Sequence, residues 1–369
     1  MLTPMPHRAG GQSGPCHGGN IYSLAAGLKT LERKILDFSA SVNPLGISKK
    51  VKAEIRKTLK YLPAYPDPDC TLLCRRLSKK TGVPEKNIMC GNGSTELIYL
   101  IVRAIKPARA LIAVPAFSEY ERALTVNGVK EIQLFPIEEK DNFNLNVEGF
   151  IEEMKDADIA FLCNPNTPTG SVLKRDAVMS IVKHAARSNC YIVVDEAFVD
   201  FVPEESVRSE VCSNPRLIVL RSLTKFYALS GLRLGAIFFH DDVAAALAGN
   251  KEPWSVNTLA QRAGAAAIND KAYEAETFKY LRKEKAYMEK MLRKLEIYFY
   301  PSEVNFYLIK DERAPVLYEE LGKRGILLRD CGNFNGLSGN YLRIAVKSHR
   351  ENAVLFRNIK SILYRYRGK

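Results

Sequence analysis

The sequence of 369 residues has no long apolar run, no internal repeat and no low-complexity segment. A helix that spans a bilayer needs about 20 consecutive apolar residues, so no membrane span is expected. Residues 1–14 contain proline, glycine and histidine where a secretory signal peptide has an apolar stretch. The eight cysteines are irregularly spaced, and Cys70 and Cys74 have no second pair that would complete a metal site. We therefore expect a cytoplasmic protein with reduced thiols and without a bound metal.

Motifs for dinucleotide cofactors and for nucleic acids are also missing. The sequence has no GxGxxG dinucleotide motif, no helix-turn-helix pattern before His17 and no stripe of interleaved basic and aromatic residues. The net charge of +13 comes from 54 basic and 41 acidic residues, which are scattered except in residues 347–369. Scattered charge is weak evidence for nucleic acid, and an enzyme that handles anionic substrates has the same balance. We expect no nucleic-acid partner, and a regulator with a basic binding surface is the disfavoured reading.

Predicted strands and helices alternate through the middle of the chain, which favours an α/β fold with a mostly parallel sheet. After Asp241 two long helices, three strands and a last helix suggest a smaller α/β domain. We place an N-terminal segment of the small domain at residues 1–47, a large cofactor-binding domain at 48–255 and a small C-terminal domain at 256–369. In a parallel sheet the active residues gather at the carboxyl ends of the strands.

The segment SLTKFYALSGLRLG, residues 222–235, lies between two predicted strands and carries the most specific chemistry. A lysine at a strand end is usually a solvated surface charge. Here Ser222 and Arg233 are able to bind one phosphate, the arginine through two parallel hydrogen bonds. Lys225 lies among apolar neighbours such as Phe226, which can partly desolvate its amine and make it nucleophilic. An anchored phosphate beside an amine that forms a Schiff base describes pyridoxal phosphate.

A second candidate for phosphate binding is the segment CGNGSTEL, in which Gly93, Ser94 and Thr95 precede an apolar helix. A glycine-rich turn before a helix exposes backbone amides to an anion, and the hydroxyls add donors. Alone this is a weak signal. It gains weight because Ser222 and Arg233 also need a phosphate to hold.

Residues 222–235 resemble the cofactor-lysine segment of the fold type I pyridoxal-phosphate enzymes, in the branch of histidinol-phosphate aminotransferases and threonine-phosphate decarboxylases. The segment YIVVDEAF adds to this resemblance, because Asp195 precedes Lys225 by thirty residues, as in those enzymes. The resemblance implies a large domain with a seven-stranded sheet and a small domain. It implies that the catalytic residues are Lys225, which forms the Schiff base and transfers protons, and Asp195, which bonds the pyridine nitrogen.

The resemblance also implies further cofactor contacts. Phe117 would stack on the pyridine ring, and Tyr65 would reach the cofactor phosphate of a neighbouring subunit, which implies a homodimer. The segment NPNTPTG resembles the family's NPNNPTG, whose asparagine before Pro-Thr-Gly bonds the phenolic oxygen. That position holds Thr167, so either Thr167 or Asn166 supplies the contact. The expected cofactor-binding residues are Gly93, Ser94, Thr95, Phe117, Asn166, Thr167, Asp195, Phe198, Ser222, Lys225, Arg233 and Tyr65.

The substrate contacts decide between the two activities of this branch. The run His17-Gly18-Gly19 resembles the HGG start of threonine-phosphate decarboxylases and is the main reason to expect decarboxylation. Asn43 either stabilises its Asn-Pro turn or lies at the substrate. The resemblance implies that two C-terminal arginines contact the phosphate and carboxylate end of the substrate. The expected substrate-binding residues are His17, Gly18, Gly19, Asn43, Asn166, Arg329 and Arg343.

The expected reaction is removal of the α-carboxylate of O-phospho-L-threonine, giving (R)-1-aminopropan-2-yl phosphate for the nucleotide loop of cobalamin. The alternative is a histidinol-phosphate or related aminotransferase with the same cofactor. O-phospho-L-serine is a further alternative substrate, because it lacks one methyl group, which is worth about 1–3 kcal/mol of discrimination.

Overall fold

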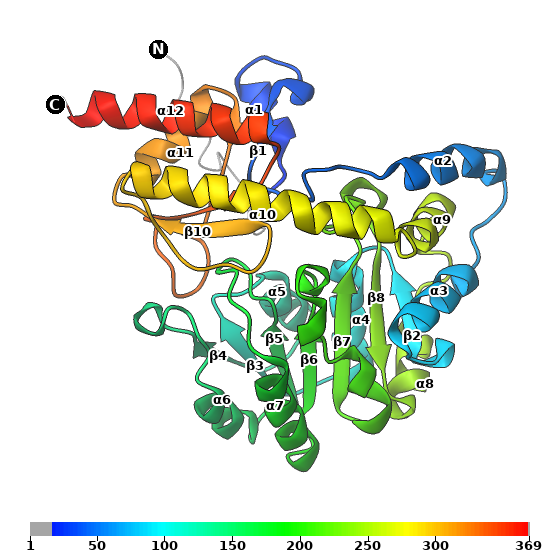
Figure 1. Ribbon diagram of the computed structural model, residues 1–369. Coiled ribbons are helices and arrows are strands. Elements are labelled where there is room, and N and C mark those ends of the chain that lie inside the picture. The colour runs from blue at the N-terminus through cyan, green and yellow to red at the C-terminus, as the bar shows by residue number, and fades with distance from the viewer. Residues whose placement is uncertain (1–16, 368–369) are drawn as a thin grey trace.

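A seven-stranded sheet forms the centre of the larger part of the protein, whose computed structural model describes residues 17–367 (Figure 1). Its strands are β2 (Ile88–Gly91), β3 (Arg109–Val114), β4 (Glu131–Pro136), β5 (Ile159–Cys163), β6 (Tyr191–Asp195), β7 (Leu217–Ser222) and β8 (Gly235–Phe239). The spatial order is β2-β8-β7-β6-β5-β3-β4. Only β8 runs antiparallel to its neighbours within this sheet. The prediction of a mostly parallel seven-stranded sheet is confirmed. Residues 1–14, which are not expected to form a signal peptide, lie outside the described range, so that expectation stays a prediction.

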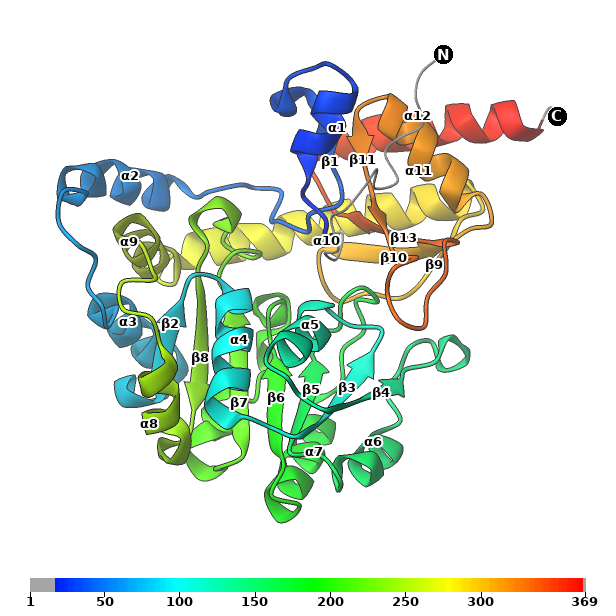
Figure 2. The ribbon, with the colours of Figure 1, turned by 180° about the vertical axis from the view of Figure 1, so that it is seen from behind.

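Helices cover both faces of this sheet because its central strands are apolar on both sides. Figure 2 shows α4, α5 and α8 in front of the sheet, and Figure 1 shows α6 and α7 on the other face. Adjacent residues of β3 illustrate the division, since Leu111 belongs to the core under α6 and α7 and Ile112 to the core under α4 and α5. The helices are α4 (Ser94–Ile105), α5 (Glu119–Val126), α6 (Val147–Met154), α7 (Arg175–Arg187) and α8 (Asp241–Asn250).

The smaller part joins the first strand of the chain to its last third. Strand β1 (Leu36–Asp37) pairs in parallel with β11 (Ile326–Leu327). A second sheet has the order β12-β13-β10-β9 and is antiparallel. Its strands are β9 (Tyr298–Phe299), β10 (Phe306–Lys310), β12 (Arg329–Asp330) and β13 (Tyr341–Ala345), and the helices packed beside it include α11 (Ala314–Lys323) and α12 (His349–Arg367).

One long helix, α10 (Lys271–Lys294), runs across both parts of the molecule (Figure 1). Helix α9 (Thr258–Ala267) packs against α2 (Lys49–Thr58) and α3 (Thr71–Thr81), on the side of the large sheet. The domain boundaries at 47 and 255 remain a proposal, and α9 lies beyond the second of them. Short helix α1 (Ile21–Gly27) precedes β1. Within residues 17–367 no helix combines the length and apolar character needed to cross a bilayer.

Candidate active site

The predicted site residues gather at one edge of the seven-stranded sheet. Asp195 ends β6 and Ser222 ends β7, so both lie at the carboxyl edge. Because β8 runs antiparallel, its first residue Gly235 pairs with Ser222 at this same edge. The loop that carries Lys225 connects β7 to β8 and therefore starts and ends here. The parallel arrangement thus brings together segments that are far apart in the sequence.

The amine of Lys225 lies in a setting that disfavours its charged form. Burial lowers the pKa of Lys225 to about 8, and the nearby positive charges of Arg343 and Arg233 contribute to the shift, while Asp195 opposes it. Among residues 17–367 this amine has no hydrogen-bond partner. A larger share of the amine than of an ordinary lysine is therefore neutral near pH 8, which is the nucleophilic form.

The carboxylate of Asp195 is fixed in orientation. The hydroxyl of Tyr120 donates to its Oδ2 at 2.6 Å, and the backbone N–H of Ala197 donates to its Oδ1 at 2.9 Å. The ring of Tyr120 stacks on Phe161 with 5.1 Å between centroids, which holds the donor in place. Burial raises the pKa of Asp195, and both hydrogen bonds and the charge of Lys225 act against that rise. A buried acid held in this way suits a partner with a protonated ring nitrogen.

A cradle without side chains lies at the N-terminus of α4. Gly93 caps this helix with φ +86°, and a Cβ on it would lie 2.4 Å from Nη2 of Arg233. A Cβ on Gly235 would lie 2.7 Å from the backbone N of Ser94. Glycine is therefore required at both positions. Free helix amides, the Arg233 guanidinium and the Ser222 hydroxyl, which lies 2.7 Å from Oγ1 of Thr224, fit a phosphate group.

Asn166 and Thr167, the two candidates for the contact with the phenolic oxygen, make different hydrogen bonds within the protein. Nδ2 of Asn166 donates to the backbone carbonyl of Pro115 at 3.1 Å, and its Oδ1 accepts from the hydroxyl of Thr169 at 2.9 Å. Both ends of this carboxamide are thus held within the protein. Oγ1 of Thr167 instead accepts a hydrogen bond of 2.7 Å from Nη1 of Arg343. These contacts favour Thr167 for the cofactor side of the loop, which remains a proposal.

The two C-terminal arginines lie close enough to repel each other. Burial, together with the positive charge of Arg329, lowers the pKa of Arg343 to about 10. Arg343 donates to the backbone carbonyl of Ser39 at 2.8 Å and lies over the ring of Phe306, but its Nε is buried without a partner in the described chain. Arg329 is buried over the ring of Phe334. Two neighbouring guanidinium groups with an unused buried donor fit an anionic ligand.

The predicted His17-Gly18-Gly19 segment packs against Phe117 and Ser39. The ring of His17 lies 5.4 Å from the ring of Phe117, centroid to centroid. The backbone N–H of Gly19 donates to Oγ of Ser39 at 2.7 Å. A Cβ on Gly18 would lie 2.3 Å from the carbonyl oxygen of Ser39, so the close approach needs glycine. The segment therefore lies between the predicted cofactor-stacking ring and the residue that accepts from Arg343.

Asn43 is placed as a positioning residue for the lysine loop. Its Nδ2 donates to the carbonyl of Phe226 and to Oγ1 of Thr277, both at 2.8 Å, and its backbone N–H donates to the carbonyl of Lys225 at 3.0 Å. Its predicted contact with substrate stays a prediction. Sequence reasoning missed Ser41, whose buried Oγ has no partner among the described residues. An unsatisfied buried hydroxyl calls for an explanation, and a ligand contact is one candidate that only the structure brings to light.

Two further predicted cofactor contacts lie differently. Tyr65 is 84 % exposed, and its ring lies beside that of Trp254 with 5.2 Å between centroids. It does not reach the site of its own chain, and its predicted role at a neighbouring subunit stays a prediction. Phe198 is buried and packs edge-to-face on Phe306 at 5.0 Å.

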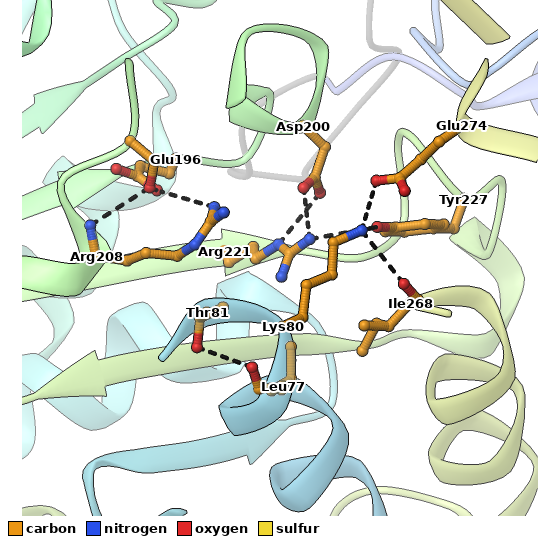
Figure 3. Close-up of polar contacts among 11 residues, drawn as sticks. Leu77, Lys80, Thr81, Glu196, Asp200, Arg208, Arg221, Tyr227, Ile268 and Glu274 are labelled. Carbon is orange, nitrogen blue, oxygen red and sulfur yellow. Dashed lines mark hydrogen bonds and ion pairs between the residues drawn. The ribbon is translucent and has the colours of Figure 1, made fainter. Parts of the chain in front are cut away.

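A polar network around the buried Arg221 involves residues on either side of Lys225 in the chain, and Figure 3 shows its contacts. Arg221 is fully buried, and its Nε donates to Oδ2 of Asp200 at 3.2 Å. The hydroxyl of Tyr227 accepts from Arg221 at 3.4 Å and from Nζ of Lys80 at 3.3 Å. Lys80 also forms an ion pair with Glu274, near the start of α10. The residues next to Ser222 and near Lys225 are thus fixed to α3 and α10.

A half-buried lysine amine, an oriented buried carboxylate and a phosphate cradle, at the carboxyl edge of this sheet, define a fold type I pyridoxal-phosphate enzyme. Residues 33–359 match the family of class I and II aminotransferases, and the chain belongs to that family. The sequence-based predictions of this family, of its fold and of pyridoxal phosphate as cofactor are thereby confirmed.

Individual relatives carry both activities of the expected branch. The chain is 39% identical over 352 residues to a threonine-phosphate decarboxylase of Salmonella typhimurium, covering 94% of this chain and 96% of the relative. The structure resembles L-threonine-O-3-phosphate decarboxylase from Porphyromonas gingivalis with a TM-score of 0.80, 26% identity and coverage of 89% and 100% of the two chains. It also resembles histidinol-phosphate aminotransferase from Clostridium acetobutylicum, with a TM-score of 0.83, 30% identity and coverage of 89% and 99%.

Proposed function

We propose that the protein is a pyridoxal-phosphate-dependent decarboxylase of O-phospho-L-threonine, which releases carbon dioxide and (R)-1-aminopropan-2-yl phosphate. The observation that carries the choice of reaction is the docking of the His17-Gly18-Gly19 segment on Ser39, beside Arg343. Ser39 thus contacts both the segment that carries His17 and Arg343, which supports a site for a substrate with two anionic groups. The similarity to a threonine-phosphate decarboxylase over 94% of the chain supports the same assignment. The use of the product in the cobalamin nucleotide loop is carried over from the family resemblance.

The geometry at the carboxyl edge of the sheet supports the proposed cofactor-binding roles. Pyridoxal phosphate, when bound, supplies an electron-withdrawing ring that draws electrons from the α-carbon through the amino nitrogen of the substrate. Lys225 would hold the cofactor and move a proton at the α-carbon. Asp195 would keep the proton on the ring nitrogen. Ser222, Arg233 and the amides of the α4 N-terminus would hold the phosphate.

The choice between decarboxylation and proton abstraction depends on how the substrate is oriented. The residues that hold the substrate decide which bond of its α-carbon the bound cofactor would weaken. Nη1 and Nη2 of Arg343 are already bonded to Thr167 and Ser39 within the protein. The unpaired Nε of Arg343, together with Arg329 and His17, would supply donors to the anionic groups of the substrate. A substrate held mainly by its phosphate would keep its carboxylate free to leave as carbon dioxide.

The test is turnover without a keto acid. The holoenzyme is incubated with O-phospho-L-threonine, and carbon dioxide and aminopropanol phosphate are measured together. We expect both products in equal amounts over many turnovers. Conversion of histidinol phosphate only after addition of 2-oxoglutarate, without carbon dioxide from phosphothreonine, would reassign the site to an aminotransferase.

Histidinol-phosphate aminotransferase is the second candidate, favoured by the structural likeness to that enzyme from Clostridium acetobutylicum at 30% identity. Histidinol phosphate has no α-carboxylate to lose, so the same substrate panel separates the two candidates. O-phospho-L-serine belongs in the panel because it differs from the proposed substrate by one methyl group.

A homodimer and a cytoplasmic location are also part of the proposal. Tyr65 and Trp254 form an exposed aromatic pair, which supports an interface because large exposed rings favour contact with another chain. Sedimentation of the holoenzyme and of Tyr65→Ala checks this part. An unchanged dimer in the variant would show that Tyr65 does not contribute to the interface.

A further inference from the structure

Glu119, the first residue of α5, is a buried carboxylate that faces the opening of the site. Its side chain is only 4% exposed. Nε2 of His17 donates to Oε1 at 2.8 Å, and the hydroxyl of Tyr99 donates to Oε2 at 3.0 Å. The guanidinium of Arg122 lies 3.6 Å from Oε1 and is half exposed. None of the cofactor or substrate contacts described above involves Glu119, so this carboxylate has no role in the proposed chemistry so far.

The hydrogen bond from His17 is the main reason why the pKa of Glu119 lies below its usual range, although burial opposes this shift. The polar groups that face Glu119 are the imidazole of His17, the guanidinium of Arg122 and the hydroxyl of Tyr99. A carboxylate this deeply buried is stable only with such partners. Its ionised form therefore lies against the imidazole of His17.

The imidazole is thus oriented by two contacts on one side. Glu119 accepts from Nε2, and the ring packs on Phe117 with 5.4 Å between centroids. The side chain of His17 is 40% exposed, so the rest of the ring stays open to a ligand. With Nε2 committed to the carboxylate, Nδ1 is the nitrogen left to meet a substrate.

We propose that Glu119 is a positioning residue that orients the His17 imidazole toward the phosphate of the substrate. The inference rests on the proposed function, because it takes a phosphorylated amino acid as the ligand. It goes beyond that function by naming what makes the site prefer the phosphorylated form over the free amino acid. Removing the charge of Glu119 should weaken this preference without changing the cofactor contacts.

The experiment measures binding to the holoenzyme by the change in cofactor absorbance. Dissociation constants for O-phospho-L-threonine and for L-threonine are compared in the wild type and in Glu119→Gln. We expect binding of the phosphorylated ligand to weaken about ten-fold, the effect of one charge-assisted hydrogen bond. Binding of L-threonine should stay within about two-fold, because it has no phosphate to lose.

Three variants make the result specific to the pair. His17→Gln should give the same loss as Glu119→Gln, and the double variant should lose no more than either, because the two residues act as one unit. Glu119→Asp, which keeps the charge, should retain part of the preference. Glu121→Gln is the matched control, since this exposed residue of the same helix bonds only Asn335 among the described residues.

Two outcomes overturn the inference. Equal weakening of both ligands in Glu119→Gln means that the carboxylate supports the fold of the site rather than phosphate binding. Unchanged binding of both ligands means that His17 needs no orienting group. Failure of the proposed function is seen separately, because it is an absence of carbon dioxide release by the wild type, while the binding comparison is made without turnover.

Discussion

Thr167 accepts a hydrogen bond of 2.7 Å from Arg343, and this contact joins the loop after β5 to strand β13 of the second sheet. Replacement of Thr167 by Val removes the acceptor and leaves a second nitrogen of the buried guanidinium unpaired, besides Nε. Loss of a hydrogen bond to a charged group costs about 1.5–3 kcal/mol. We therefore expect KM for O-phospho-L-threonine to rise about ten-fold or more. Steady-state kinetics of carbon dioxide release checks this.

Thr167→Ser is the matched control for that prediction. Serine keeps the hydroxyl and removes only the methyl group, so the bond to Arg343 persists. Thr167→Ser should therefore resemble the wild type. Equal kinetics of Thr167→Val and Thr167→Ser would show that the bond does not position Arg343.

The cradle at Gly93 predicts a specific loss of cofactor affinity. In Gly93→Ala the new Cβ would lie 2.4 Å from Nη2 of Arg233, so the guanidinium must move from the phosphate position. Gly128→Ala is the control, because Gly128 also has positive φ, +75° against +86°, but open space around it. Both variants carry the strain of a positive φ, and Gly93→Ala adds the strain of ψ 162°, a conformation that is essentially limited to glycine and costs about 1–3 kcal/mol. Only Gly93→Ala should lose pyridoxal phosphate on dialysis. Equal retention of the cofactor by both variants would show that the turn at Gly93 does not bind its phosphate.

The depressed pKa of Lys225 predicts how cofactor capture depends on pH. The apoprotein should take up pyridoxal phosphate with a rate that rises through pH 8, because the neutral amine appears there rather than near 10.5. Between these two values the unfolded chain binds more protons than the folded one. The contribution of Lys225 to the free energy of unfolding therefore rises with pH across this window. Absorbance at several pH values measures the uptake, and a midpoint near 10 would contradict the prediction.

Lys225→Ala is the control in the same experiment. It should give no borohydride-reducible absorbance at any pH and no turnover. Lys155→Ala, at an exposed lysine of the surface pair with Glu152, should behave as the wild type.

The sequence predicted the edge of the sheet where the site lies, because its signals are local. Lys225 and Asp195 each follow a short apolar run, and such runs predict strands whose ends meet in a parallel sheet. Strand β2 was not located, since its four residues Ile88–Gly91 are too few to show alternation. Helices α8 and α11 were also missed; α8 is rich in alanine, which gives it little apolar periodicity.

What the sequence did not reveal are the contacts made across long separations. The carboxamide of Asn43 bonds residues 183 and 234 positions away, which no spacing rule indicates. Ser41 carries no motif, and its unsatisfied hydroxyl becomes meaningful only when burial is known. The pairing of Glu119 with His17 likewise spans 102 positions. The chemistry of single segments was therefore predictable, while the groups that orient them were not.

The ion pair between Arg221 and Asp200 gives the last prediction, which concerns stability. Arg221 is fully buried and Asp200 is 7% exposed, so removing one charge leaves the other unpaired in the core. We expect Asp200→Ala to lower the free energy of unfolding by about 3–5 kcal/mol. Lys155→Ala, which breaks an exposed pair, should cost less than about 1 kcal/mol. Urea unfolding of the apoprotein compares the two variants.

The double variant Arg221→Met/Asp200→Leu separates the charge from the packing. It removes both charges and fills similar volume, so it should recover much of the stability lost in Asp200→Ala. It also removes the hydrogen bond of 3.4 Å from Nη2 of Arg221 to the hydroxyl of Tyr227, which is two residues from Lys225 in the chain. We therefore expect the double variant to fold but to turn over more slowly, because the lysine loop has lost its support. Full activity in a stable double variant would show that the network under the loop serves the fold alone.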